Sequence, residues 1–120
     1  MRILLVDDEP LLRLSLGDAL ASEGHEVTLA ADGASALEAI QSGRELDLIV
    51  CDIHLPKMSG LELLEEMHSA RPDTPFIVMT AYGLGGDGHT AVENGAAELL
   101  TKPFEVETLL RAITRVVTVA

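Results

Sequence analysis

Short apolar runs alternate with segments of helical periodicity along the whole chain. Five of these runs predict buried strands, at residues 3–6, 27–30, 47–51, 76–79 and 99–100. Between and after them, apolar residues recur every three or four positions, as expected of helices that bury one face. This alternation predicts an α/β fold in which five βα units build a doubly wound parallel sheet.

Local signals predict where several of the helices begin and end. Pro10 is a typical first helical residue and Asp32 a typical N-cap, whereas Gly24 and Gly43 are typical of helix ends. The clearest helix spans residues 106–117, where an apolar stripe runs without interruption. We expect the helices to pack on the sheet through these apolar faces.

A glycine-rich segment, GLGGDG at residues 83–88, lies where the fourth helix is expected to begin. Glycine costs about 1 kcal/mol relative to alanine inside a helix, so this helix is predicted to begin late, near Asp87 or His89, and to fray. The segment also matches the pattern Gly-x-Gly-x-x-Gly. The dinucleotide-binding fingerprint belongs to the first βα turn, however, whereas this segment follows the fourth strand, so we do not predict nucleotide binding.

The composition is that of one globular domain spanning residues 1–120. Of the 120 residues, 48% are hydrophobic, enough to bury about two-thirds of the unfolded surface. No apolar run approaches the roughly 18 residues of a membrane span and no signal-peptide pattern is present, so we expect a soluble, cytoplasmic protein with no membrane partner. The net charge of −12 disfavours direct binding to nucleic acid. The single cysteine, Cys51, lies in an apolar strand and is predicted to be buried and unreactive.

Polar side chains stand at or just after the ends of four predicted strands. Asp7 and Asp8 follow the first strand, Asp52 the third, Thr80 the fourth and Lys102 the fifth. In an open parallel sheet, the carboxyl ends of the strands form the edge at which binding sites lie. We therefore expect three carboxylates, a hydroxyl and an ammonium to converge on one small cleft.

Three carboxylates at close quarters repel one another unless a cation neutralises them. Their oxygen atoms favour a hard divalent ion, Mg²⁺ or Mn²⁺, bound by Asp7, Asp8 and Asp52. The four histidines are scattered over different predicted elements, so no zinc site is predicted. Taken alone, the Asp7–Asp8 pair is also typical of a helix N-terminus, where negative charge is favoured.

A carboxylate beside a cation, an ammonium and a hydroxyl is the set of groups needed to accept a phosphoryl group. Asp52 ends the central strand and is the predicted nucleophile, attacking phosphorus through a carboxylate oxygen. Lys102 and Thr80 are predicted to contact the phosphoryl oxygens and to stabilise charge during transfer. Considered singly, an ordinary ion pair would explain Lys102, and a strand-end cap would explain Thr80.

Four motifs cover most of the chain in a characteristic order. They are LVDDEP at residues 5–10, CDIHLPKMSG at 51–60, MTAYG at 79–83 and LTKPF at 100–104. In this order and spacing, they make the sequence resemble the response-regulator receiver domain of two-component signalling. The resemblance implies a flavodoxin-like fold, with a five-stranded parallel sheet in the order 2-1-3-4-5 flanked by five helices.

The resemblance also implies how the acidic residues act. Asp52 would accept a phosphoryl group from a histidine-kinase phosphohistidine or from a small phosphodonor. Asp8, Asp52 and the backbone carbonyl of His54 would bind Mg²⁺ directly, and Asp7 would act mostly through water. Such a domain is not an enzyme in the usual sense, because it catalyses only its own phosphorylation and slow dephosphorylation.

The remaining implications concern switching and partners. Thr80 would contact the phosphoryl group and move with it, and Lys102 would pair with it. The Lys102–Pro103 bond is expected to be cis, which would aim Lys102 into the cleft. The expected partners are a sensor histidine kinase or phosphotransfer protein and an output domain or partner protein. A homodimer through the face formed by the fourth helix, fifth strand and fifth helix would also suit the family.

Two departures from the family pattern concern the switch. Leu99 stands where an aromatic residue is usual, so coupling between Thr80 and an aromatic ring is not expected. The glycine-rich residues 83–88 stand where the family usually has a more regular helix start. We expect activation to change the order of residues 83–94 instead. His54 and Tyr82 are expected at the rim of the cleft and are predicted to affect the lifetime of the phosphoaspartate.

Three other classes of protein share parts of this pattern. A flavodoxin-like cofactor binder would need a phosphate loop after the first strand, where this chain is acidic. A haloacid-dehalogenase-type phosphatase would need a second aspartate where His54 stands. A receiver-like interaction module that works without phosphorylation remains the strongest alternative.

Overall fold

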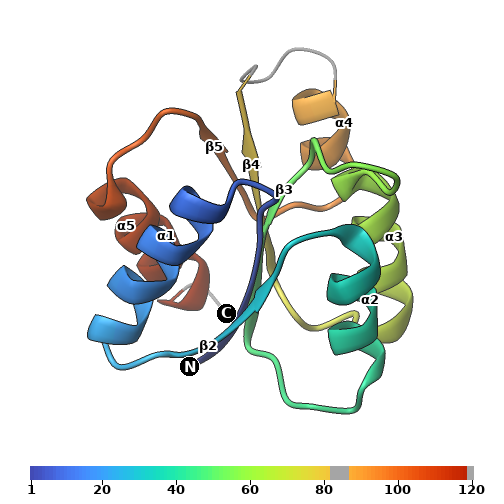
Figure 1. Cartoon of the computed structure of the whole chain (residues 1–120). Coiled ribbons are helices and arrows are strands. Elements are labelled where there is room, and N and C mark those ends of the chain that lie inside the picture. Colours follow the sequence, from blue (N-terminus) through green and yellow to red (C-terminus); the bar gives the residue numbers. More distant parts are fainter. Residues whose placement is uncertain (82–86, 119–120) are drawn as a thin grey trace.

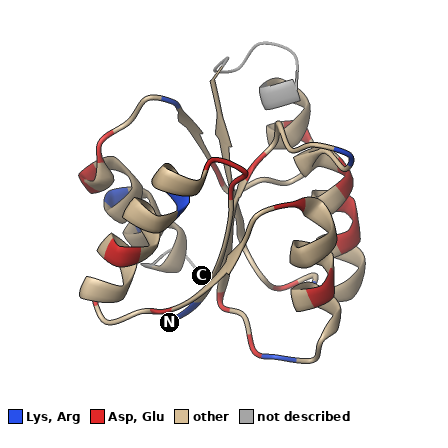
Figure 2. Cartoon of the chain, in the orientation of Figure 1, with Lys and Arg blue, Asp and Glu red and all other residues tan. Residues whose placement is uncertain are grey.

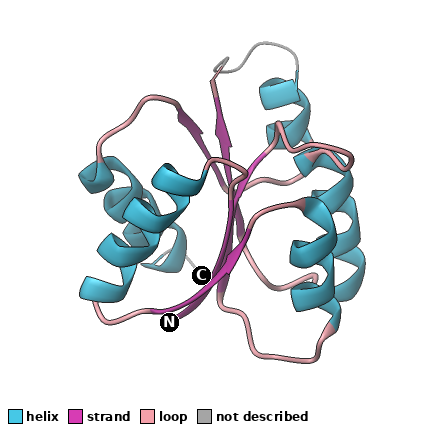
Figure 3. Cartoon of the chain, in the orientation of Figure 1, coloured by secondary structure: helices cyan, strands magenta, loops and turns pink. Residues whose placement is uncertain are grey.

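The computed structural model describes residues 1–81 and 87–118, in which five strands alternate with five helices (Figures 1 and 3). In chain order these are β1 Arg2–Val6, α1 Pro10–Ser22, β2 Glu26–Ala30, α2 Gly33–Gln41, β3 Leu48–Asp52, α3 Gly60–Ala70, β4 Phe76–Thr80, α4 Asp87–Glu93, β5 Glu98–Thr101 and α5 Val106–Thr118. The predicted βα alternation is therefore confirmed.

The strands form one parallel sheet in the order β2-β1-β3-β4-β5. This order confirms the predicted doubly wound fold and its flavodoxin-like topology. Val6 pairs in register with Cys51, and Thr80 pairs with Thr101. The C-terminal ends of β1, β3, β4 and β5 consequently lie at one edge of the sheet, which is where the polar residues were predicted to gather.

Helices cover both faces of the sheet (Figure 1). On one side, α1 and α5 join strand residues such as Leu5 and Met79 in one apolar cluster. On the other side, α2, α3 and α4 join residues such as Leu4 and Val78 in a second cluster. Neighbouring residues of a strand thus enter opposite clusters, as the alternation of side chains requires. Burial on both faces explains why the strands are continuous apolar runs rather than alternating ones.

The helix ends follow the predicted signals. Pro10 is the first residue of α1, and the Asp32 carboxylate caps α2 by accepting a hydrogen bond from the Ser35 backbone N–H at 2.8 Å. That bond lowers the pKa of Asp32. Gly24 and Gly43 lie just beyond α1 and α2 with φ of +89° and +82°, a conformation that glycine adopts without strain.

The fourth helix begins at Asp87, as predicted from the glycine-rich segment. Tyr82 and residues 83–86 lie outside the described residues. The predicted role of Tyr82 and the expected change of order in residues 83–94 therefore stay predictions.

Acidic residues are spread over much of the molecule (Figure 2). The figure shows Asp and Glu on the loop between β1 and α1 and along α2 and α3, whereas Lys and Arg are few. Among the described residues, none of the helices has the length and apolarity needed to cross a membrane.

Candidate functional site

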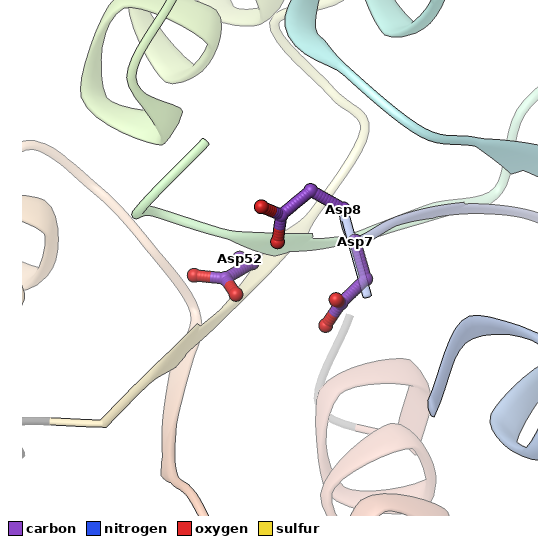
Figure 4. A group of neighbouring side chains, drawn as sticks. All are labelled: Asp7, Asp8 and Asp52. Carbon is purple, nitrogen blue, oxygen red and sulfur yellow. The ribbon is translucent and has the colours of Figure 1, made fainter. Parts of the chain in front are cut away.

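Asp7, Asp8 and Asp52 come together at the C-terminal edge of the sheet (Figure 4). Asp7 and Asp8 directly follow β1, and Asp52 is the last residue of β3. One carboxylate oxygen of each residue lies within 4.8 Å of the corresponding oxygens of the other two. Asp7 has 0% and Asp52 6% of its surface exposed, whereas Asp8 is exposed. The three carboxylates therefore lie together as predicted, two of them buried and one exposed to solvent.

Lys102 joins the two buried carboxylates. Its Nζ donates to Asp52 Oδ2 at 2.6 Å and to Asp7 Oδ2 at 2.8 Å. Burial of the ammonium lowers its pKa, but the hydrogen bonds that it donates to Asp52 and Asp7 outweigh this effect, so that the pKa of Lys102 is raised. The Lys102–Pro103 peptide bond is cis, as expected. The ammonium thus offsets part of the charge of the cleft.

Asp7 is held from several directions. Its Oδ1 accepts the Glu9 backbone N–H at 2.8 Å, while Oδ2 accepts Lys102. The Arg13 guanidinium, one turn into α1, donates to the backbone carbonyl of Asp7 at 2.8 Å. The role of Arg13 was missed from the sequence, because an arginine on a helix carries no signal for a contact with the preceding loop.

The loop after β3 fixes the position of Asp52 through backbone hydrogen bonds. The His54 backbone N–H donates to Asp52 Oδ1 at 2.8 Å, and the Gly60 N–H donates to the Ile53 carbonyl at 3.0 Å. A Cβ on Gly60 would lie 2.5 Å from Ile53 Cα and 2.9 Å from the Asp52 carbonyl oxygen. Only glycine fits this close approach, so Gly60 positions Asp52 through the backbone of Ile53. The sequence offered one signal for this role, namely a glycine directly before an apolar helical stretch.

Thr80 ends β4 on the other side of Asp52 and is completely buried. Its Oγ1 lies 3.1 Å from Nε2 of His54, whose side chain reaches across from the β3–α3 loop. His54 had been expected at the rim of the cleft, but this contact between its ring and Thr80 had not been predicted. The structure thus brings all the predicted cleft residues within its described part to one place.

Other candidates lie away from the cleft. Leu99 is partly buried and packs against the apolar cluster under α2, α3 and α4. His25 is at the opposite end of the sheet beside the N-terminal amine, and His89 pairs with Glu93 on α4. Cys51 is fully buried, and burial raises the pKa of its thiol well above the usual range, as expected of an unreactive cysteine.

The arrangement supports the chemistry of a hard cation and a transferred anion. Among the described residues, the carboxylates of Asp7, Asp8 and Asp52 lie close enough together to hold a metal ion. Its oxygen-only donor set suits a divalent ion of the Mg²⁺ type, and the exposed Asp8 leaves room for water ligands. The ammonium of Lys102 donates to the Asp52 carboxylate, and the hydroxyl of Thr80 contacts His54, two residues after Asp52.

Comparison with known proteins identifies the family. The model of the response regulator receiver domain matches residues 3–114. The transcriptional regulatory protein TcrA of Mycobacterium tuberculosis is 39% identical over 118 residues, and the response regulator MprA of Mycobacterium avium is 40% identical over 110 residues. These matches cover 96% and 92% of this chain but 46% and 48% of the relatives. The chain thus spans about half the length of these curated relatives.

Solved structures agree with this result. A CheY-like response regulator receiver domain protein from Methanospirillum hungatei is 35% identical with a TM-score of 0.89, covering 95% of this chain and 90% of that one. The response regulator TrrA from Thermotoga maritima, solved with Mg(2+)-BeF, is 34% identical with a TM-score of 0.84, covering 96% and 97%. The family predicted from the four motifs is confirmed: the chain belongs to the receiver domains of two-component response regulators.

Proposed function

We propose that this receiver domain, spanning residues 1–120, is a phosphorylation-activated switch in which Asp52 accepts a phosphoryl group in a Mg²⁺-dependent reaction. The observation that carries the proposal is the environment of Asp52. One of its oxygens accepts the Lys102 ammonium at 2.6 Å, and Asp7 and Asp8 complete an acidic cluster beside it. A nucleophile, a cation to neutralise the incoming phosphoryl group and donors for a metal ion thus share one cleft.

In the proposed step, a carboxylate oxygen of Asp52 attacks the phosphorus of a phosphohistidine. A P–O bond to Asp52 forms while the P–N bond breaks, and the departing imidazole keeps the electron pair and takes up a proton from solvent. Lys102 already donates to Asp52, so a small movement would bring its ammonium to a phosphoryl oxygen. Thr80 would donate its hydroxyl to another. Catalysis is limited to this transfer and to slow hydrolysis of the product.

The residues of the cleft fit a Mg²⁺ ion. Asp8, Asp52 and the backbone carbonyl of His54 would bind it directly. Both carboxylate oxygens of Asp7 already accept hydrogen bonds, from Glu9 and Lys102, so Asp7 would act through water. A bound Mg²⁺ would supply positive charge to the carboxylates and to the phosphoryl oxygens during transfer.

The phosphodonor would approach along the first helix. Leu11 on α1 is 79% exposed and Leu14 is 52% exposed, large fractions for leucines. A hollow of about 390 Å³ at the start of the same helix is lined by Glu9, Leu12 and Phe104 and includes Lys102 of the cleft. We propose that a histidine kinase or phosphotransfer protein covers this apolar rim while its phosphohistidine enters the cleft.

We propose that phosphorylation changes the α4-β5-α5 face. This face would then contact an output domain, a partner protein or a second copy of the chain in a homodimer. Within the chain, Arg115 donates to Glu98 across this face at 2.7 Å, joining α5 to β5. Any partner that uses Arg115 would have to compete with this pair. Response regulators typically act in the cytoplasm, and we propose the same location, with no membrane and no direct nucleic-acid contact by this domain.

Intact-mass measurement after incubation with acetyl phosphate tests the proposal. A gain of one phosphoryl group that requires Mg²⁺ and is lost in Asp52→Asn is the expected result. If no gain occurred although Mg²⁺ binding had been confirmed separately, the phosphorylation-independent interaction module would be favoured instead.

A further inference from the structure

His54 connects the end of β3 to the end of β4 through its side chain. Its Nε2 lies 3.1 Å from Thr80 Oγ1, within hydrogen-bonding distance. Thr80 has no exposed surface, whereas His54 belongs to the exposed part of the β3–α3 loop. An exposed ring therefore contacts a fully buried hydroxyl, and it is the hydroxyl assigned to the phosphoryl group.

The backbone of the same residue is fixed at Asp52. The His54 N–H donates to Asp52 Oδ1 at 2.8 Å, and the neighbouring Ile53 carbonyl accepts the Gly60 N–H. The tight contact of Gly60 with Ile53 leaves this part of the loop little freedom. A change at Thr80 would consequently move the ring of His54 more readily than its main chain.

Position 99 lies on the same side of the sheet as this contact. Thr80 follows Val78 by two residues and so projects to the same face of β4, and Val78 pairs in register with Leu99 on β5. Leu99 packs in the apolar cluster of that face. The Leu99 side chain has no group that could form a hydrogen bond with the Thr80 hydroxyl. The ring of His54 has such a group, and it contacts that hydroxyl.

We propose that His54 is a positioning residue that holds the Thr80 hydroxyl in the unphosphorylated state and releases it when Asp52 is phosphorylated. This inference rests on the proposed function. The Thr80 hydroxyl has one proton. In the His54 tautomer whose Nε2 carries no hydrogen, that proton goes either to Nε2 or to a phosphoryl oxygen, but not to both. Phosphorylation therefore exchanges one hydrogen bond for another, and the freed ring carries the change from β4 into the β3–α3 loop.

A double-mutant cycle tests the inference, with beryllofluoride and Mg²⁺ as the phosphoryl mimic. His54→Ala removes the ring but keeps the backbone bond to Asp52. A net hydrogen bond is worth about 1 kcal/mol, so His54→Ala should bind the mimic about fivefold more tightly than the wild type. In the Thr80→Val background, which has no hydroxyl to hold, His54→Ala should have no effect. His25→Ala, at the other end of the sheet, is the matched control and should bind as the wild type.

Nitrogen NMR of the His54 ring supplies a second readout. In the wild type, Nε2 should shift when the mimic binds, and most of this shift should be absent in Thr80→Val. Unchanged or weaker binding in His54→Ala, an equal gain in the Thr80→Val background, or a full Nε2 shift in Thr80→Val would overturn the inference. If fluorine NMR showed no bound mimic in the wild type, the proposed function itself would fail, and this inference with it.

Discussion

Replacing Lys102 by methionine should destabilise the metal-free protein and make its stability depend on Mg²⁺. The change keeps a long apolar side chain but removes the ammonium that donates to Asp7 and Asp52. Both carboxylates are almost completely buried, and removing one partner of a buried ion pair costs about 3–5 kcal/mol. The Lys102 side chain keeps 19% of its surface exposed, so water reaches the site, and we expect a loss nearer about 2–3 kcal/mol.

The same substitution should strengthen Mg²⁺ binding. A positive charge a few ångströms from a divalent ion costs on the order of 1–2 kcal/mol even where water screens it well. Removing that charge should tighten binding about tenfold. At free Mg²⁺ about 100 times the Kd of the variant, binding stabilises the variant by about 2.7 kcal/mol and the wild type by about 1.4 kcal/mol. The loss relative to the wild type should therefore shrink by about 1.3 kcal/mol when Mg²⁺ is present.

Urea unfolding followed by circular dichroism, with EDTA and with Mg²⁺, measures these effects. Lys57→Met is the matched control, because Lys57 is the other lysine of the chain and is exposed. Its effect should stay within about 0.5 kcal/mol in both conditions. A loss in Lys102→Met that is equally large with and without Mg²⁺, or no loss at all, would refute the view that the ammonium offsets the charge of the cleft.

Three further predictions concern single groups. Gly60→Ala should lower the free energy of unfolding by about 1–3 kcal/mol and weaken Mg²⁺ binding, because its Cβ would overlap the backbone at Ile53. Urea unfolding measures the first effect and calorimetry the second. Gly17→Ala is the control and should be nearly neutral, because its Cβ would meet only the flexible end of a leucine side chain. Burial, and then the charge of the N-terminal amine, lower the pKa of His25 below 6.5. The neutral ring is therefore favoured in the fold, so this contribution to stability is present above about pH 6.5 and is lost as the pH falls below that value. Relative to His25→Gln, the wild type should therefore lose stability as the pH falls below about 6.5, which urea unfolding at a series of pH values measures. The thiol of Cys51 should react with a thiol reagent only at the rate of unfolding, and rapid reaction under native conditions would contradict its burial.

The sequence predicted the fold and the composition of the cleft because both follow from simple periodicity. Buried parallel strands appear as apolar runs, and their carboxyl ends must share an edge, so the positions of Asp52 and Thr80 were already informative. The contacts within the cleft were less predictable. Whether Lys102 reaches one carboxylate or two depends on the side-chain path, and periodicity carries no information about it.

Contacts made by loops were the hardest to predict. The His54 ring reaches Thr80 only because the β3–α3 loop turns back sharply, with Lys57 at φ +69° and Gly60 packed on Ile53. These backbone conformations are set by tertiary packing rather than by local preference. The same holds for Arg13, whose contact with the Asp7 carbonyl depends on how α1 is placed against β1.

The central claim is that Asp52 carries the phosphoryl group, and locating that group on the chain tests it most directly. Protein treated with acetyl phosphate and Mg²⁺ would be reduced with borohydride, which converts a phosphoaspartate into a stable product, and the modified residue would be located by peptide sequencing. The account predicts modification at Asp52, with none at Asp7 or Asp8. Modification elsewhere in the wild type, or modification that persists in Asp52→Asn, would contradict it.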